Sequence, residues 1–138
     1  MRSVYYFSIF IALLMLGCEQ NNQEWGEITD WTSRERDNEL MAELLEEIQG
    51  LSMQVECTDA ENWSWTAYGS KACGGPVGYI AYSQGIDTNY FLELIEYHAE
   101  QQDLFNQKWG IISTCDIPIQ PSGIYCEDGK PQFGYYYE

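Results

Sequence analysis

The stretch "WSWTAYGSKACGGPVGYIAYS", residues 63–83, places two short apolar runs on either side of a glycine-rich corner. In the first run Trp63, Trp65 and Ala67 occupy every second position, which is the period of a strand that buries one face. The second run, "VGYIAYS" at residues 77–83, also predicts a strand. This stretch therefore indicates that the domain contains a sheet.

The corner itself, "CGGP" at residues 73–76, has two interpretations. A reactive cysteine or a phosphate cradle is one, because glycines expose backbone donors. A P-loop, however, needs Gly-Lys-Ser or Gly-Lys-Thr at the start of a helix, and no such element follows Gly75. Gly74 and Gly75 can take a positive φ, and Pro76 fixes the exit direction. We therefore interpret the corner as a tight turn beside a crosslinked Cys73.

Two segments with helical periodicity flank residues 63–83. In the first, apolar residues recur at intervals of three and four positions, and Thr32 with Glu35 has the spacing of a capping box. Gly50 stands where a helix would end, so we expect the helix to stop there. The alternating residues that follow, 51–55, predict a half-buried strand.

The second helical segment runs from about Thr88 to Lys108. Asp87 or Thr88 can cap its N-terminus, and Gly110 is placed to stop it. One stripe of this helix is apolar and should face the core, whereas the opposite stripe is acidic and should face solvent. The apolar stripe consists of Phe91, Leu94, Ile95, His98, Phe105 and Trp109. After the helix, "IISTCDI" at residues 111–117 predicts another strand.

The C-terminal stretch "GIYCEDGKPQFGYYY" predicts a hairpin. The Asp-Gly pair at residues 128–129 suits a type I′ turn, which places Glu127 opposite Lys130 as an oppositely charged pair. The same register pairs Cys126 with Pro131, and a proline at that position implies an edge strand.

These elements predict a single α+β domain over residues 32–138. Two helices would pack on one face of a small, mainly antiparallel sheet, and disulfides would stabilise the whole. The chain of 138 residues is long enough for one domain of ordinary size, so we expect one core.

The first 17 residues are typical of an export signal, because Arg2 precedes an apolar run at residues 4–16. The run is shorter than the roughly 20 residues that a membrane-spanning helix needs, so we expect it to be cleaved. "LMLGC" resembles the lipobox of bacterial lipoproteins. The resemblance implies that Cys18 is acylated, for example with palmitate, that residues 18–31 form a tether, and that the protein is anchored at the bacterial envelope, on the inner or outer membrane, outside the cytoplasm. The alternative is that Cys18 is an ordinary disulfide partner.

If Cys18 carries lipid, four cysteines remain, and an even number suits an oxidising compartment such as the periplasm. They are Cys57, Cys73, Cys115 and Cys126. Three pairings are possible, and proximity along the chain favours Cys57 with Cys73 and Cys115 with Cys126. Four cysteines can also bind zinc, but no Cys-x-x-Cys spacing occurs, so we expect disulfides and no metal.

The net charge of −16 limits the partners of this protein. Nucleic acids and anionic lipid headgroups favour basic surfaces, so neither is expected to bind. Cationic partners such as a basic protein, a peptide or calcium remain compatible with this charge, although a solubilising surface is the simpler explanation.

Residues 63–130 resemble a group of small secreted or lipid-anchored bacterial proteins. The shared pattern is G-x-K-x-C-G-G-P-x-x-Y-x-x-Y-S, then a helix with Tyr and Asn, then S-x-C and P-x-x-x-x-C-x-x-G. The matching positions are Gly69, Lys71, Cys73, Gly74, Gly75, Pro76, Tyr79, Tyr82, Ser83, Asn106, Cys115, Pro121, Cys126 and Gly129. The resemblance implies a fold-sized unit and an exported location, and it implies no activity.

Aromatic residues make up 15% of the chain, more than a core of this size is expected to use. Tyr135, Tyr136 and Tyr137 are consecutive, so alternation along a strand would place rings on both faces and leave one face exposed. Exposed tyrosines suit contact with protein or carbohydrate. We therefore expect a binding surface at this run.

A thiol enzyme is the main alternative. Cys73 would need a base within hydrogen-bond reach, and the chain offers one histidine, His98, on an apolar helix stripe where a packed imidazole is the commoner outcome. Among the carboxylates, Asp116 alone has apolar neighbours of the kind that raise a pKa. We therefore expect a non-catalytic binding or structural module without a cofactor. An envelope hydrolase or thiol-dependent enzyme near Cys73 is the alternative.

Overall fold

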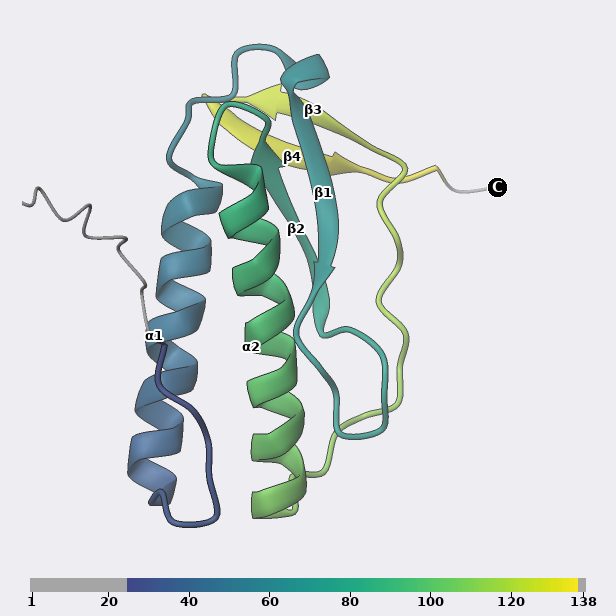
Figure 1. Ribbon diagram of the computed structural model, residues 1–138. Helices are drawn as coiled ribbons and strands as arrows, with labels where there is room; N and C mark the ends of the chain where they lie inside the picture. The colour runs from purple at the N-terminus through teal and green to yellow at the C-terminus, as the bar shows by residue number, and fades with distance from the viewer. Residues whose placement is uncertain (1–24, 137–138) are drawn as a thin grey trace, which may run out of the picture.

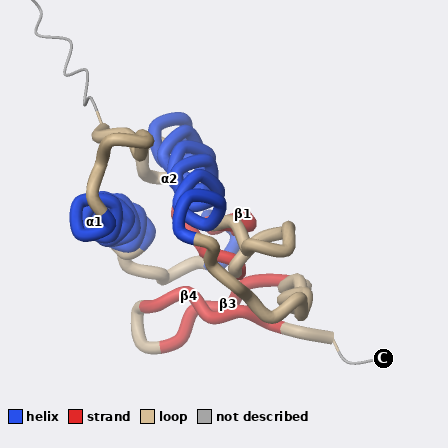
Figure 2. The backbone as a smooth tube through the Cα atoms, turned by 90° about the horizontal axis from the view of Figure 1, so that it is seen from below, coloured by secondary structure: helices blue, strands red, loops and turns tan. Residues whose placement is uncertain are grey.

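Two helices lie side by side on one face of a β-hairpin, and a second hairpin lies across the opposite face (Figures 1 and 2). The computed structural model describes residues 25–136. The α+β class is confirmed. In place of one sheet, however, the strands form two separate two-stranded sheets, β1–β2 and β3–β4.

Helix α1, Arg34–Ser52, begins one residue later than the capping-box prediction requires. Ser33 is the N-cap, and its side chain accepts a hydrogen bond from the Arg36 backbone N–H. The Thr32 hydroxyl donates to the Thr29 carbonyl, 2.8 Å away, and Ser33 takes the capping position in its place. The Thr32–Glu35 capping box is therefore wrong.

The end of α1 also differs from the prediction. Gly50 lies inside the helix, which continues to Ser52, and residues 51–55 form no strand. The buried Ser52 hydroxyl donates to the carbonyl of Ala81 in β2 at 2.6 Å, and this contact fixes the last turn against the sheet. A tertiary contact has therefore extended a helix that local signals would end at Gly50.

Helix α2, Thr88–Trp109, matches the prediction closely. The Asp87 side chain accepts from the Tyr90 backbone N–H, and Gly110 ends the helix in the left-handed conformation at φ 58°. The predicted apolar stripe is the one that packs inward, since Phe91 and Leu94 are fully buried in the core between the helices and β1–β2.

A short 3₁₀ turn, Ala60–Asn62, leads into β1, Trp63–Tyr68, which pairs antiparallel with β2, Gly78–Ser83. Because side chains alternate along a strand, the hairpin has two packed faces. Tyr68, Ile80 and Tyr82 contact the helices. Trp63 and Ala81 contact β3–β4 on the other face, which makes a second, smaller core.

The second hairpin joins β3, Gly123–Glu127, to β4, Lys130–Gly134. Asp128 and Gly129 both have positive φ, 50° and 74°, as a type I′ turn requires. Glu127 pairs with Lys130 and Cys126 with Pro131, so the predicted register is confirmed.

The segment between α2 and β3, residues 111–121, is irregular, and the predicted strand at 111–117 is wrong. It runs past the β1–β2 hairpin on the side away from α1 (Figure 1, yellow-green). Ile112 and Ile117, whose apolar character suggested a strand, are 95% and 86% exposed. Its apolar residues are therefore not buried by any strand pairing.

The chain before α1 packs against both helices, although residues 25–31 were expected to belong to the tether. Ile28 is buried in the main core, and its backbone N–H donates to Gln101 Oε1 at 2.7 Å. The Trp25 ring lies 5.7 Å from the Tyr90 ring and 5.0 Å from the Tyr97 ring. Trp25 and Ile28 are thus part of the packed structure, whereas Trp31 is exposed.

Candidate functional site

One disulfide, Cys57 to Cys126, joins the chain before β1 to strand β3, with a Cα–Cα distance of 5.3 Å. The pairing favoured by sequence proximity is therefore wrong. The β3–β4 hairpin packs on β1–β2, and the Cys57 backbone N–H donates to the Gly129 carbonyl at 2.8 Å. Packing of the two hairpins brings together cysteines 69 residues apart.

The other two cysteines in the described chain, Cys73 and Cys115, are exposed thiols in this structure. Both line one cavity, and the Cys73 thiol donates to the carbonyl of Thr114, the residue before Cys115, at 3.6 Å. The glycine corner is a tight turn, as expected, because Gly74 and Gly75 have φ of 92° and 80°. Two backbone hydrogen bonds of 2.9 Å, Gly74 N–H to the Lys71 carbonyl and Lys71 N–H to the Gly75 carbonyl, close it. This turn holds Cys73 against the irregular segment.

The surroundings of the two thiols make them unequal. The hydrogen bond with Cys115, followed by one from the Ser113 hydroxyl at 3.4 Å, lowers the pKa of Cys73, and the positive charge of Lys71 adds to the effect. The hydrogen bond with Cys73 raises the pKa of Cys115. Cys73 is therefore the thiol that ionises first.

Lys71 and Asp116 tie the corner to the irregular segment. The Lys71 ammonium donates to the Asp116 carbonyl at 2.6 Å and lies 3.2 Å from its carboxylate. Hydrogen bonds from Thr114 and Lys71 lower the pKa of Asp116. The expectation that apolar neighbours would raise this pKa is wrong, because the carboxylate is exposed and paired.

A cavity of about 350 Å³ opens at the corner. It is lined by Cys73, Gly74, Gly75, Pro76, Cys115, Asp116, Ile117 and Pro118. His98 is not part of it. The imidazole is buried in α2 beside a different cavity, between residues of α1 and α2, and that burial lowers its pKa. The structure therefore does not assemble a Cys73–His98 pair.

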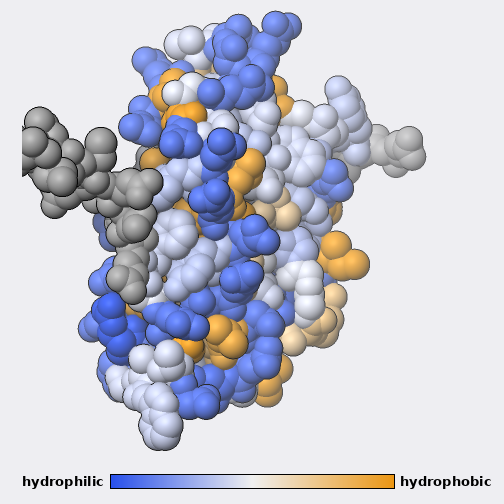
Figure 3. All heavy atoms as spheres, in the orientation of Figure 1, coloured by the Kyte–Doolittle hydropathy of each residue, from blue (hydrophilic) through white to orange (hydrophobic). Residues whose placement is uncertain are grey.

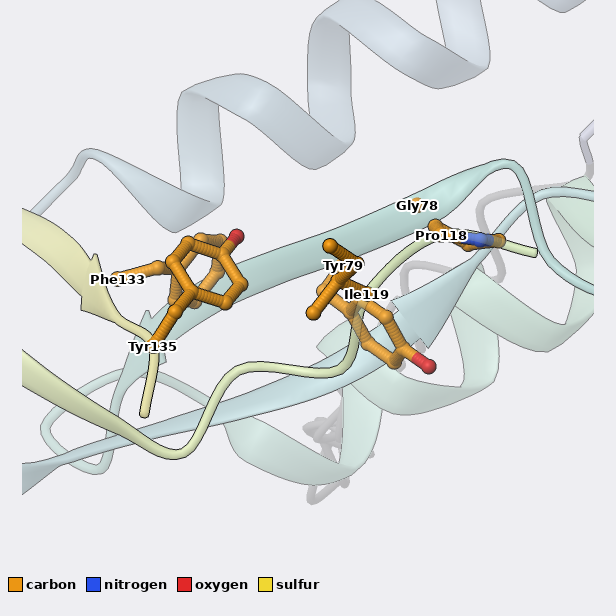
Figure 4. Close-up of a pocket in the computed structure, with 6 residues that line it drawn as sticks. All are labelled: Gly78, Tyr79, Pro118, Ile119, Phe133 and Tyr135. Carbon is orange, nitrogen blue, oxygen red and sulfur yellow. The ribbon is translucent and has the colours of Figure 1, made fainter. Parts of the chain in front are cut away.

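A second cavity, an apolar groove of about 330 Å³, lies between β2, the end of β4 and the irregular segment. Figure 4 shows Phe133 and Tyr135 at one end of this groove and Tyr79 and Ile119 at the other, near Pro118. Tyr79 is supported from β1, because its ring meets the Trp65 ring edge to face at 5.3 Å.

The tyrosines of the expected binding surface do not all lie in the same place. Tyr135 lines the aromatic groove and is 40% exposed, and Tyr136 is 87% exposed. Tyr137 lies outside the described residues. Sequence reasoning missed the other wall of the groove, Tyr79 with Pro118 and Ile119, although the alternation of β2 does place Tyr79 on the same face as Ala81.

Glutamates lie on the exposed faces of both helices, and several strongly exposed apolar side chains lie in the irregular segment. The first turn and the exposed face of α1 carry glutamates, as does the exposed face of α2. Apolar side chains gather along the right-hand edge in Figure 3, where Figure 1 places the irregular segment with its exposed Ile112, Ile117 and Ile119.

No family model, no curated protein and no solved structure matches this chain. Within residues 25–136, no group of side chains is arranged to hold a metal ion. In the same part of the chain, no helix combines the length and the apolar character that crossing a bilayer requires.

Proposed function

We propose that this chain is a lipid-anchored protein of the bacterial cell envelope whose domain binds a partner, without catalysis, through the aromatic groove. The observation that carries the proposal is the groove itself. Tyr79, Phe133 and Tyr135 present rings from two different hairpins to a single open cavity. Concave apolar sites with a few polar groups are the usual form of a binding site, and rigid rings lose little entropy when a partner covers them.

The chemistry of the groove favours a protein partner over a carbohydrate. Apart from the backbone, its polar groups are the hydroxyls of Tyr79 and Tyr135. A sugar would bury several hydroxyls against Pro118 and Ile119 with few hydrogen bonds in return, and each unpaired buried hydroxyl is costly. An apolar segment of a neutral or basic envelope protein suits both this lining and the net charge of −16.

The proposed anchor, Cys18, lies outside the described residues, and its support is the lipobox-type signal. Packing of the chain from Trp25 onward limits the reach of the anchor, because seven residues span at most about 25 Å when fully extended. The segment at 25–31 lies beside the helices, whereas β4 and the irregular segment, which contribute to the lining of the groove, lie on the side of β1–β2 away from α1 (Figures 1 and 2). A protein attached in this way would present the groove away from its point of attachment.

Photocrosslinking in cells tests the groove. A benzophenone amino acid at Ile119 should give a discrete adduct of higher mass with a protein partner. The matched control carries the same amino acid at Glu96, on the exposed face of α2. Adding Tyr135→Ser to the Ile119 probe should weaken the adduct, because it removes one wall of the groove.

Equal adducts at Ile119 and Glu96, or none at either position, would contradict the groove as a binding site. An adduct that glycan-degrading enzymes remove would replace the protein partner with a carbohydrate. The anchor is tested separately by intact mass of the mature protein. That mass should show acyl chains on Cys18, and Cys18→Ser should release the protein from membranes.

The alternative, a thiol-dependent enzyme, is favoured by one observation, the exposed Cys73 thiol with a lowered pKa beside a cavity. The side chains that interact with it most directly are a second thiol, Cys115, and the Ser113 hydroxyl, and neither is the base that acyl transfer needs. The Asp116 carboxylate lines the same cavity but is paired with Lys71. Repeated turnover of a p-nitrophenyl ester that is lost in Cys73→Ala and kept in Cys115→Ala would favour the enzyme. A single acylation event per chain would argue against it.

A further inference from the structure

We propose that Cys73 and Cys115 form a second, reversible disulfide that holds the irregular segment in place and so keeps the aromatic groove formed. The effect of the bond on binding in the groove, which we call gating, depends on the proposed binding function. The formation of the disulfide does not depend on it. The Cys57–Cys126 bond leaves Cys73 and Cys115 as the other possible pair in the described chain. Both line the same cavity, and Cys73 hydrogen-bonds to Ser113 and Thr114, the two residues that precede Cys115.

The irregular segment depends on the corner for its position. Residues 111–121 have no helix or strand of their own. Their contacts with the corner are the Lys71–Asp116 pair and the hydrogen bonds of Cys73 with Ser113 and Thr114, all at exposed positions. Exposed contacts of this kind stabilise weakly, so a covalent bond at the same place would change how firmly the segment is held.

The position of the segment bears directly on the groove. Pro118 lines both the cavity beside Cys115 and the aromatic groove, and Ile119 follows it in the groove wall. Only Asp116 and Ile117 lie between Cys115 and Pro118 along the chain. A bond that fixes Cys115 therefore fixes one wall of the groove, while Tyr79 and Phe133 are held by the paired strands β2 and β4.

Thiol–disulfide exchange is the chemistry that would form the bond. The Cys73 thiolate attacks one sulfur of an external disulfide, which gives a mixed disulfide and releases one thiolate. Cys115 then loses its proton and attacks the Cys73 sulfur, which closes the intramolecular bond and releases the second thiolate. Two protein thiols are oxidised, one external disulfide is reduced to two thiols, and the protons pass to the released thiolates. The lower pKa of Cys73 fits its role as the first attacking thiol.

The proposed Cys73–Cys115 bond should be easier to reduce than the Cys57–Cys126 disulfide. Cys57 is buried between the hairpins, with only 3% of its surface exposed, whereas Cys73 and Cys115 are both exposed. A mild reductant should therefore open the corner bond first and leave the buried one intact. Exposed disulfides of this kind are the ones that exchange readily, so the corner bond could open and close while the buried bond stays intact.

The test begins with the purified full chain carrying Cys18→Ser, so that four cysteines remain. After mild reduction, oxidised glutathione is added and the disulfides are mapped by mass spectrometry without reduction. The expected linkages are Cys57–Cys126 and Cys73–Cys115. The Cys115→Ser variant should stop at a glutathione adduct on Cys73. Absence of the Cys73–Cys115 linkage while Cys57–Cys126 forms would overturn the proposal.

Two further measurements separate the effect of the bond on the irregular segment from its effect on binding in the groove. They are hydrogen exchange and crosslinking. Reduction of the corner bond should raise amide exchange in residues 111–121 by more than about tenfold, with β1 and β2 unchanged. Unchanged exchange in that segment would overturn the role of the bond in holding it. The Ile119 crosslink should weaken in Cys73→Ser and Cys115→Ser, and an equally strong adduct in these variants would overturn the gating. If the bond forms and protects the segment but Ile119 gives no adduct in any state, the proposed binding function fails and the disulfide stands.

Discussion

Asp37 is almost wholly buried, with 1% of its surface exposed, and it joins three parts of the fold. One carboxylate oxygen accepts from the Lys108 ammonium at 2.8 Å and from the Trp109 indole N–H at 2.9 Å. Lys108 also donates to the Thr29 and Thr32 carbonyls, both at 2.6 Å. Helix α1, the end of α2 and the chain before α1 therefore meet at one ion pair.

Asp37→Asn should destabilise the protein by about 3 kcal/mol, because it leaves the partly buried charge of Lys108 without a counterion. The matched control is Asp103→Asn, since that exposed carboxylate accepts only from Gln107 on its own helix. The control should change the free energy of unfolding by less than about 0.5 kcal/mol. Urea unfolding measures both, and equal losses in the two variants would contradict the role given to the buried pair.

The Asp37 pair also predicts acid sensitivity. Burial raises the pKa of Asp37, but the hydrogen bonds from Lys108 and Trp109 and the positive charge of Lys108 outweigh it, so the pKa lies below its ordinary value. A carboxylate whose pKa is lowered on folding stabilises the native state above about pH 4, and this stability is lost as the pH falls through the native pKa. Unfolding followed from pH 5 downward should therefore show a steeper loss for the natural protein than for Asp37→Asn.

The buried imidazole of His98 should cause a second loss of stability, at a higher pH than the loss expected from Asp37. Its imidazole is buried, Nδ1 has no hydrogen-bond partner within the described structure, and desolvation lowers its pKa from 6.5. Below that value the unfolded chain binds a proton that the folded chain does not, so stability falls as the pH drops from about 7 to about 5.

Because the chain has one histidine, His98→Gln should remove most of the pH dependence in this range. Melting temperatures at pH 7, 6 and 5 measure the effect. Parallel curves for the natural protein and His98→Gln would show that the imidazole is not responsible. The apolar stripe of α2 predicted the burial of His98 correctly, whereas nothing near Asp37 in the sequence indicated its pairing with Lys108, which lies 71 positions away.

At the scale of elements, two helical glycines illustrate where local signals suffice. Gly110 ends α2 in the left-handed conformation, as its position after the apolar stripe predicts. Gly50 lies within α1, where the contact of Ser52 with Ala81 carries the helix past it. A glycine thus ends α2, whereas another glycine lies inside α1. The difference comes from the packing of α1 on β2.

The two glycines should respond in opposite directions to alanine. A Cβ at either position has no neighbour within 4 Å, so sterics do not decide the outcome. Gly50→Ala should stabilise the protein by about 0.5 to 1 kcal/mol, because alanine is the better helix former. Gly110→Ala should destabilise it by about 1 kcal/mol, because its φ is positive. Urea midpoints that shift in the same direction for both would contradict this account.

The two wrong strands, at 51–55 and 111–117, share a cause. Alternation of apolar residues predicts a strand only if a partner strand is available to pair with it. The first becomes the end of α1 and a turn, and the second runs past the hairpins without a partner. The four strands that do form belong to two hairpins, and each of those brings its own partner within a short stretch of chain.

At the scale of the whole molecule, the Cys57–Cys126 disulfide spans 69 residues and joins the chain before β1 to the last hairpin. A crosslink over a loop of that size restricts the unfolded chain and stabilises the fold by about 4 kcal/mol on the chain-entropy estimate. The β3–β4 hairpin otherwise adheres through a small core around Trp63 and Ala81.

The double variant Cys57→Ala with Cys126→Ala should therefore lose about 4 kcal/mol of stability, and the loss should be largest for β3 and β4. Urea unfolding gives the total, and hydrogen exchange gives its distribution. The natural protein after full reduction is the control and should behave like the variant. If the variant unfolds at the same urea concentration as the oxidised natural protein, the packing of the two hairpins alone holds β3–β4.

The sequence by itself determined the α+β class, helix α2, strands β1 and β2, and the β3–β4 hairpin with its register. Each of these depends on a period or a turn within a few neighbouring residues. Only the tertiary structure decided which cysteines pair, where α1 ends, how residues 111–121 run, and that Tyr79 and Tyr135 line one groove. Those features depend on contacts between residues far apart in the chain, such as Cys57 with Cys126 and Lys71 with Asp116, and no local pattern records which distant surfaces will meet.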